Sequence, residues 1–286
     1  MTLARMTTFK IRQMKKKGKK IVMLTAYDAP SAQILSECKV DMILVGDSVG
    51  NALLGHESTI PVTLFDVMHH CAAVARAKPN SLIVGDMPFM SYKVSEEQAL
   101  ENCGLMLQEG GAEAVKIEGG GRVVDIVKVV VDSGIPVMGH IGLTPQSIFE
   151  MGGYRIQGRT ADTAKQLVKE AKALEKAGAF SMVIELVPSE TAKLITESVG
   201  IPTIGIGAGP HCDGQVLVLP DMLGLFQDFK PKFVKRYANI RDVITKAVQE
   251  YSAEVRSGEF PSEEYSFEMK EEETGRLYGR TKPPDE

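Results

Sequence analysis

The sequence has no apolar run long enough to cross a bilayer. Its longest, residues 71–75, has five residues, against about 20 for a spanning helix. No apolar core follows the charged N-terminus, so we also expect no secretion signal. Basic residues do not predominate: 33 Lys and Arg stand against 37 Asp and Glu, a net charge of −4. This balance argues against a general nucleic-acid-binding protein.

Metal-binding cysteine patterns are absent as well. No C-x-x-C pair occurs, which argues against a zinc ribbon or a disulfide framework. Free thiols favour a reducing cytoplasm. His69 and His70 have no second pair of ligands in register, so we predict no zinc site there. The four cysteines are Cys38, Cys71, Cys103 and Cys212.

Eight short apolar runs, rich in Val and Ile, alternate with amphipathic stretches. They are apolar on both faces, as is typical of parallel strands covered on both sides. Eight such units favour a closed (β/α)8 barrel, with an open doubly wound sheet as the alternative. The predicted strands span 20–24, 41–46, 81–85, 112–117, 135–139, 180–186, 201–206 and 215–219.

Helix signals separate these strands. Ser95 with Gln98 and Thr63 with Asp66 are helix-start pairs, and residues 161–177 and 240–255 carry apolar stripes. We predict one barrel domain over residues 1–258, including an N-terminal helix and a C-terminal amphipathic helix. The charged stretch 259–286 is predicted to be a surface arm or a disordered end.

Carboxylates follow three neighbouring strands. Each of three apolar runs ends in an acid, namely Asp47, Asp86 or Glu118. Residues two positions apart in a strand face the same side, so Asp47 and Asp86 each face the same side as the apolar residue two positions earlier. By the same rule Glu118 faces the same side as Lys116. In a barrel, the chemistry is built at these carboxyl ends. If those faces point inward, three carboxylates and one ammonium converge.

Such a cluster needs compensating charge, because three unpaired carboxylates would force one to protonate. Lys116 and a divalent cation together would balance them. Oxygen ligands without His or Cys favour Mg²⁺. The alternative for any single acid is a solvated loop residue or a helix N-cap.

Two further polar residues end later strands. Glu185 follows apolar neighbours, which suits a general base, although an ion pair with Arg155 or Arg159 is equally compatible. His140 closes the fifth strand, either as a substrate contact or as a hydrogen-bonded structural residue. The one basic run, residues 10–20, is an RNA-binding patch or, more simply, a solvated first helix.

Taken together, several ordered motifs resemble the 3-methyl-2-oxobutanoate hydroxymethyltransferase (ketopantoate hydroxymethyltransferase) family from about residue 10 to residue 267. They are MLTAYD at 23–28, VGDSVG at 45–50, GDMP at 85–88, VKIEGG at 115–120, GHIGLTPQ at 139–146, GGY at 152–154, GAG at 207–209 and CDGQ at 212–215.

The resemblance implies a phosphoenolpyruvate-mutase-like barrel with Mg²⁺ held around Asp47, Asp86 and Glu118. It further implies that the 2-oxo acid contacts Asp47, Ser48, Asp86 and Lys116 and that Glu185 accepts the proton. The reaction would be the first step of pantothenate biosynthesis, with 5,10-methylenetetrahydrofolate as the one-carbon donor. The family implies homo-oligomers, homodecamers in bacterial relatives, with no membrane or nucleic-acid partner.

Two other readings stay open. The same barrel could serve a metal-dependent C–C lyase or a phosphonomutase. A lyase of this type is expected to use a loop cysteine as its acid, and the loops after the second to sixth predicted strands contain none. An RNA-binding module that uses residues 10–20 is a distant alternative.

Overall fold

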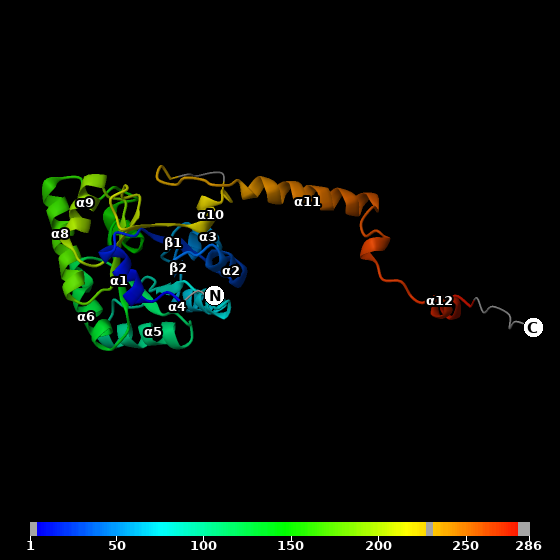
Figure 1. Ribbon diagram of the computed structural model, residues 1–286, viewed down its shortest axis with the longest axis horizontal. Coiled ribbons are helices and arrows are strands. Elements are labelled where there is room, and N and C mark those ends of the chain that lie inside the picture. The colour runs from blue at the N-terminus through cyan, green and yellow to red at the C-terminus, as the bar shows by residue number, and fades with distance from the viewer. Residues whose placement is uncertain (1–4, 227–230, 280–286) are drawn as a thin grey trace, which may run out of the picture. The chain divides into compact units, whose positions relative to one another are not determined.

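The computed structural model describes residues 5–226 and 231–279, and in it eight parallel strands form a closed barrel in sequence order (Figure 1). Strand β1 pairs with both β2 and β8, which closes the ring. The predicted barrel is thus confirmed over the open sheet. The strands are β1 (Ile21–Thr25), β2 (Met42–Val45), β3 (Leu82–Asp86), β4 (Ala114–Glu118), β5 (Val137–Gly142), β6 (Ser181–Glu185), β7 (Thr203–Ile206) and β8 (Gly214–Leu217).

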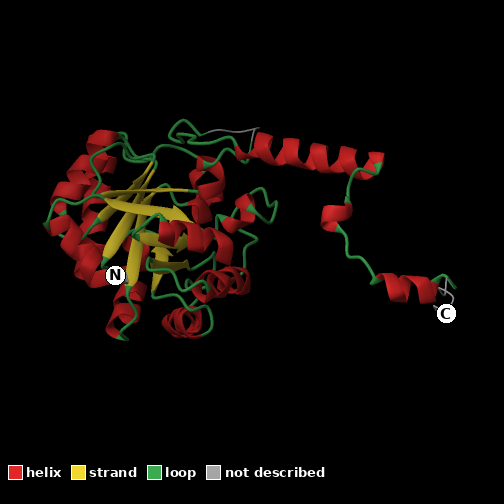
Figure 2. Cartoon of the chain, turned by 45° about the vertical axis from the view of Figure 1, so that its right-hand side comes forward, coloured by secondary structure: helices red, strands yellow, loops and turns green. Residues whose placement is uncertain are grey.

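Helices surround the strands on the outside (Figure 2). The start predicted at Thr63 is a full capping box with Asp66, and Ser95 caps its helix by accepting from Gln98 N at 3.2 Å. The longer helices are α2 (Ala29–Glu37), α4 (Leu64–Arg76), α5 (Glu96–Gln108), α6 (Val124–Asp132), α8 (Ala161–Lys176) and α9 (Ser189–Ser198). Short ones are α3 (Val49–Ala52), η1 (Gly121–Val123), η2 (Pro145–Ser147), α7 (Ile148–Met151) and α10 (Leu219–Met222).

Strand alternation produces two apolar layers. Ile43 and Val45 of β2 belong to the layer between the strands and the helices. Met42 and Leu44 of the same strand belong to a separate cluster inside the barrel, together with Val84 of β3. A filled interior is the normal state of a barrel of eight strands. The polar site therefore occupies only the end of the barrel beyond this packed layer.

The N-terminal helix α1 (Thr8–Lys16) covers the other end of the barrel. Ile11 is fully buried in the interior cluster. Lys15 Nζ lies 3.0 Å from Asp213 Oδ2 and donates to the Ile201 carbonyl, and Lys20 Nζ donates to the Cys212 carbonyl. These carbonyls precede β7 and β8. Part of the basic run thus holds α1 against the barrel floor.

Residues 1–237 and 238–286 form two compact units. The second contains α11 (Ile240–Ser257), η3 (Glu263–Tyr265) and α12 (Glu271–Leu277). The prediction that the long helix belongs to the barrel domain stays a prediction. The stretch from 259, predicted to be a surface arm or a disordered end, contains the short helix α12, with Glu271–Glu273 in its first turn and Arg276 in its last, as the helix dipole favours. None of the described helices is both long and apolar enough for a membrane span.

Candidate active site

Asp86 and Lys116 form the centre of the polar cluster. The register of β3 and β4 pairs the two residues, and Lys116 Nζ lies 2.8 Å from Asp86 Oδ1. Both side chains are almost fully buried, with exposed fractions of 5% for Lys116 and 2% for Asp86. Burial lowers the pKa of Lys116, but the carboxylates of Asp86, Asp47 and Glu118 outweigh it and raise that pKa. The lysine is therefore a permanent buried cation.

Asp47 reaches the cluster by a different route from the one the strand pattern predicts. Ile43 and Val45, with which it shares parity, face outward, and β2 ends at Val45. The chain then turns at Gly46, and Asp47 N donates to Asp86 Oδ2 at 3.1 Å. A Cβ at Gly46 would lie 2.8 Å from Ser48 Oγ and 3.5 Å from Asp86 Oδ2. Its absence lets the Asp47 backbone approach Asp86.

The buried Asp47 carboxylate lies among like charges. Burial is the main cause that raises its pKa well above the usual value, and Asp86 and Glu118 raise it further, while Lys116 lowers it. The inward-facing assignment is confirmed for Asp86 and for the Lys116–Glu118 pair, because Val84 and Ala114 on the same strand faces pack inside the barrel. The three predicted carboxylates and the lysine are therefore neighbours.

His140 connects two carboxylates across the barrel mouth. Its Nδ1 lies 3.4 Å from Glu118 Oε2, and its Nε2 lies 3.2 Å from Glu185 Oε2. Burial and Lys116 lower the pKa of His140, but the contacts with Glu118 and Glu185 raise it to about 9. The imidazole is consequently protonated near neutral pH. The partner of Glu185 is this histidine and not the loop arginines considered above.

Gln146, which the sequence did not single out, is held between the carboxylates. Its Nε2 donates to Asp47 Oδ2 at 3.0 Å and to the Met87 carbonyl at 2.9 Å, while its backbone N donates to Glu118 Oε1 at 2.9 Å. The Tyr92 hydroxyl lies 2.9 Å from Gln146 Oε1. Reversing the amide would place its oxygen against two oxygens, so the network fixes its orientation. Gln146 closes the motif at 139–146, but a buried amide gives no sequence signal.

A small cavity of about 150 Å³ lies at this mouth. Its walls include Asp86, Lys116, His140 and Glu185, with apolar residues such as Val183 below. Ser48, predicted to bind substrate, also lines the cavity and shares a hydrogen bond of 2.9 Å with the Tyr27 hydroxyl. An apolar cavity of roughly this size holds a benzene-sized molecule. The cavity therefore suits a small acid.

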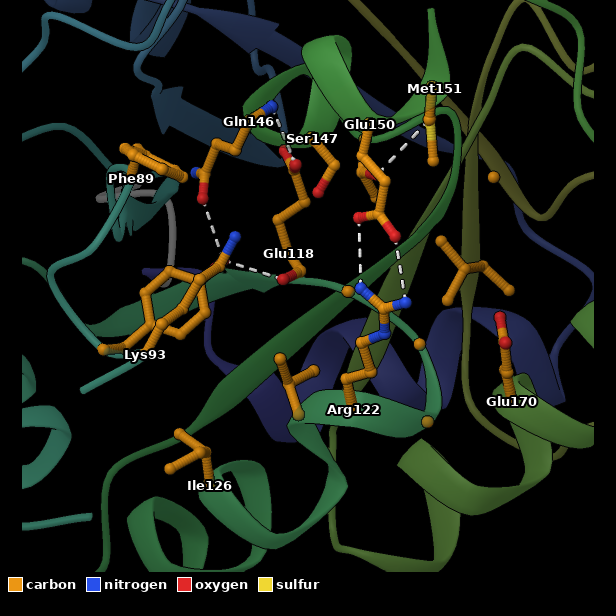
Figure 3. A pocket seen from close by; sticks show the side chains of 18 of the residues that line it. Phe89, Lys93, Glu118, Arg122, Ile126, Gln146, Ser147, Glu150, Met151 and Glu170 are labelled. Carbon is orange, nitrogen blue, oxygen red and sulfur yellow. Dashed lines mark hydrogen bonds and ion pairs between the residues drawn. The ribbon is translucent and has the colours of Figure 1, made fainter. Parts of the chain in front are cut away.

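A second cavity has a volume of about 1020 Å³ (Figure 3). Loops after β3, β4 and β5 form its walls. Glu118 and Gln146 lie on its inner side, while Arg122 and Glu150 form a two-bonded ion pair, with N–O distances of 3.0 and 2.9 Å, at an exposed part of the wall. Figure 3 shows Lys93 and Phe89 on the wall near Gln146.

The buried charges fit a divalent cation. Asp47, Asp86, Glu118 and Glu185 carry four negative charges when ionised, and Lys116 and His140 supply two positive ones. The acids offer hard oxygen donors. Among residues 5–226 and 231–279, no three His, Cys, Asp or Glu side chains are arranged to hold one ion by themselves. Mg²⁺ commonly binds through one or two carboxylates plus water and substrate oxygens, so this donor set fits it.

Comparisons with known proteins identify the family to which this chain belongs. The ketopantoate hydroxymethyltransferase family profile matches residues 5–263. A 3-methyl-2-oxobutanoate hydroxymethyltransferase from Syntrophomonas wolfei is 52% identical over 276 residues, covering 96% of this chain and 100% of the relative. One from Dehalococcoides mccartyi is 56% identical over 265 residues, covering 93% of this chain and 95% of the relative.

Solved structures share the fold at low sequence identity. Phosphoenolpyruvate phosphomutase from Streptomyces platensis has a TM-score of 0.58 at 13% identity, covering 95% of each chain. 2,3-Dimethylmalate lyase has a TM-score of 0.57 at 15% identity, covering 95% of this chain and 94% of that one. These likenesses confirm the phosphoenolpyruvate-mutase-like barrel. The sequence relatives confirm the enzyme class, and the chain belongs to the ketopantoate hydroxymethyltransferase family.

Proposed function

We propose that the chain transfers a hydroxymethyl group from 5,10-methylenetetrahydrofolate to C3 of 3-methyl-2-oxobutanoate, which gives 2-dehydropantoate for pantothenate biosynthesis. One observation carries this proposal. The Lys116–Asp86 pair and the Glu185–His140 pair line one small cavity at the barrel mouth. That cavity offers a cation for an acid substrate and a carboxylate for its acidic hydrogen. The names of the relatives support the same reaction.

Lys116 is the cation for the substrate. It is buried, and its ammonium is surrounded by carboxylates of the cluster. A 2-oxo acid brings a carboxylate and a keto oxygen, and negative charge grows on the keto oxygen when C3 loses its proton. A preorganised cation stabilises that charge strongly in a site with little water. Asp47, Ser48 and Asp86 complete the proposed contacts with the substrate, and the last two line the cavity.

Glu185 is the proposed proton acceptor. Its side chain lies at the cavity wall with an exposed fraction of 19%. His140 Nε2, 3.2 Å from Glu185 Oε2, holds this carboxylate in position at the cavity wall. The C–H bond at C3 breaks, and its proton passes to Glu185 while the electron pair forms the enolate. The proximity of a general base contributes about 10²–10⁴-fold to such a step.

The new C–C bond joins C3 to the methylene carbon of the donor. Both C–N bonds of that carbon are broken in the overall reaction, one water supplies the hydroxyl oxygen, and tetrahydrofolate leaves. We infer that Mg²⁺ is held around Asp47, Asp86 and Glu118, not all of which need touch it directly, and that when bound it supplies further positive charge beside the substrate oxygens. A phosphonopyruvate hydrolase of the same fold, at 11% identity and a TM-score of 0.59, was solved with oxalate and Mg²⁺. Oxalate, like a 2-oxo acid, presents two adjacent oxygen-bearing carbons.

We further infer a homo-oligomer, a decamer by family resemblance, that works in the cytoplasm. An exposed apolar face on α11 supports self-association, since large exposed apolar patches often mark interfaces. Its residues are Val243, Ile244, Val248, Tyr251 and Val255. Sedimentation of the purified chain tests this proposal, and a monomer at micromolar concentration would contradict it.

Release of tetrahydrofolate is the direct test of the reaction. The chain is incubated with 3-methyl-2-oxobutanoate and the donor, with and without EDTA. We expect stoichiometric 2-dehydropantoate and tetrahydrofolate, with turnover lost in EDTA and restored by Mg²⁺. Cleavage of the acid without any donor would favour the lyase alternative. Full turnover in EDTA would remove the metal from the proposal.

A further inference from the structure

We propose that the cavity of about 1020 Å³ beside the barrel mouth binds the one-carbon donor, a reduced folate, and that Lys93 binds its glutamate carboxylates. This inference rests on the proposed function, because only a two-substrate reaction needs a second site. The cavity is far larger than the acid cavity of about 150 Å³. It lies at the upper end of the range usual for organic ligands, about 300–1000 Å³.

The two cavities share a thin wall. Glu118 lines the larger cavity and His140 lines the smaller one, and their side chains lie 3.4 Å apart. In the loop after β5, Thr144 and Gln146 line the larger cavity while Pro145, between them, lines the smaller. A donor in the larger cavity therefore lies close to an acid in the smaller one, and transfer of the one-carbon unit requires the side chains between them to move aside.

Lys93 is a cation without an acidic partner. Its Nζ lies 5.3 Å from the centroids of the Phe89 and Tyr92 rings. In the part of the chain that the structure describes, no carboxylate lies within 4.0 Å of it. Burial lowers the pKa of Lys93, and the charges of Glu118, Asp47 and Glu150 offset that lowering only in part, so the ammonium lacks a close counter-charge. An anionic ligand group would supply that charge.

The other charged groups of this cavity are already engaged. Arg122 pairs with Glu150. Glu118 accepts from Gln146 N and contacts His140. Glu170 accepts from Gln166 Nε2 at 3.0 Å. Among the described lining residues, Lys93 is therefore the charged group that can bind an anion. Among the common one-carbon donors, a folate carries carboxylates at the end of a long tail.

The loop that carries Lys93 is held in place before any ligand arrives. The Pro88 carbonyl accepts from Ser91 N at 3.1 Å and from Ser91 Oγ at 2.7 Å, and Asn102 Nδ2 donates to the Ser91 carbonyl at 2.6 Å. Met90 has a φ of 62°, a left-handed conformation that is strained for a residue other than glycine. Such strain concentrates at ligand-binding loops. The Phe89 ring, 37% exposed, adds a flat apolar surface for an aromatic ligand.

The test compares tetrahydrofolate with a tetrahydropterin that lacks the glutamate tail. Both are titrated into the wild type, Lys93→Met, Lys93→Arg and the surface control Lys128→Met. We expect the Kd for tetrahydrofolate to rise about tenfold in Lys93→Met, as for loss of one charge-assisted contact, and to be largely restored by Lys93→Arg. The tetrahydropterin should bind all four proteins alike.

A donor-free reaction separates this inference from the proposed function. Exchange of the C3 hydrogen of 3-methyl-2-oxobutanoate with deuterated water needs the small cavity only, and we expect it to be equal in wild type and Lys93→Met. Absence of exchange in the wild type would overturn the proposed function. If exchange is normal, two results would overturn the assignment of Lys93. One is an unchanged Kd for tetrahydrofolate in Lys93→Met. The other is an equal loss of affinity for tetrahydrofolate and for the tetrahydropterin.

Discussion

The side-chain amide of Gln146 donates to the Asp47 carboxylate at 3.0 Å, although the two residues are 99 positions apart in the chain. Because the backbone N of Gln146 also donates to Glu118, one residue holds carboxylates from the loop after β2 and from the end of β4. Tyr92 in turn fixes the amide. Gln146 thus sets the relative position of two proposed metal ligands.

We therefore predict that Gln146→Met weakens metal binding. The methionine conserves volume but removes both donors to Asp47 and Met87 and the acceptor for Tyr92. Loss of such a supporting contact typically costs about 10–100-fold in metal affinity, measured here by titration with Mn²⁺ and detection of the free ion by EPR. Gln166→Met, on the surface of α8, is the control. Equal Mn²⁺ affinity in both variants would rule out a positioning role.

Glu185→Gln should abolish exchange of the C3 hydrogen of 3-methyl-2-oxobutanoate with deuterated water. The amide keeps the shape of the side chain but cannot accept the proton, so the acid should still bind. Proton NMR follows exchange, and calorimetry follows binding. Glu190→Gln, in the exposed first turn of α9, should leave exchange unchanged. Wild-type exchange in Glu185→Gln would assign the base to another residue.

Lys116→Met should destabilise the fold as well as impair the reaction. It leaves the buried Asp86 and Asp47 charges uncompensated, and breaking one side of a buried pair costs about 3–5 kcal/mol in the free energy of unfolding. Urea unfolding measures it. The double variant Lys116→Met with Asp86→Asn should lose less than the sum of the two single losses. Lys193→Met, from the exposed pair with Glu197, should cost under about 1 kcal/mol. Additive losses would mean that the pair is not coupled.

Lys15→Met should loosen α1 from the barrel floor. Lys15 Nζ contacts Asp213 at 3.0 Å and donates to the carbonyls of Thr196 and Ile201. Hydrogen bonds that involve a charged group contribute about 1.5–3 kcal/mol, so we expect a loss of this order in urea unfolding. The kcat should hold, because the contact lies at the end of the barrel opposite the site. The exposed Lys16→Met is the control, and a loss of equal size there would contradict the prediction.

Thiol labelling should distinguish the cysteines of the folded chain. Cys38 is exposed, whereas burial raises the pKa of Cys71 and of Cys103 to about 12. Only the thiolate reacts, and its fraction at pH 8 falls about tenfold for each unit by which the pKa rises. Iodoacetamide should therefore modify Cys38 first, as mass spectrometry of peptides would show. Labelling of Cys71 at the rate of Cys38 without denaturant would mean that the α4 packing opens readily.

The sequence was sufficient for the barrel because strand periodicity and helix caps are local properties. Runs of Val and Ile that alternate with helix N-caps, such as Thr63 and Ser95, are typical of parallel strands connected by helices. Inward-facing Asp86 and Glu118 followed from the same alternation. The α12 helix was missed because its stabilisation comes from charges at its two ends and not from an apolar stripe.

Asp47 and Gln146 show where sequence reasoning failed. Alternation assigned Asp47 to the correct cluster for the wrong reason, since Val45 faces outward and the turn at Gly46 redirects the chain. Gly46 in the sequence could have signalled such a turn. Gln146 acts through contacts with residues 99 and 28 positions away. No local pattern encodes contacts at that separation.

The apolar side chains that fill the barrel beneath the site determine where small molecules can enter and leave. Ile11 seals the lower opening of the cylinder, and Met42, Leu44 and Val84 occupy its bore. No small molecule can pass through such a plug. Both substrates of the proposed reaction must therefore enter, and both products leave, at the end of the barrel that carries the site.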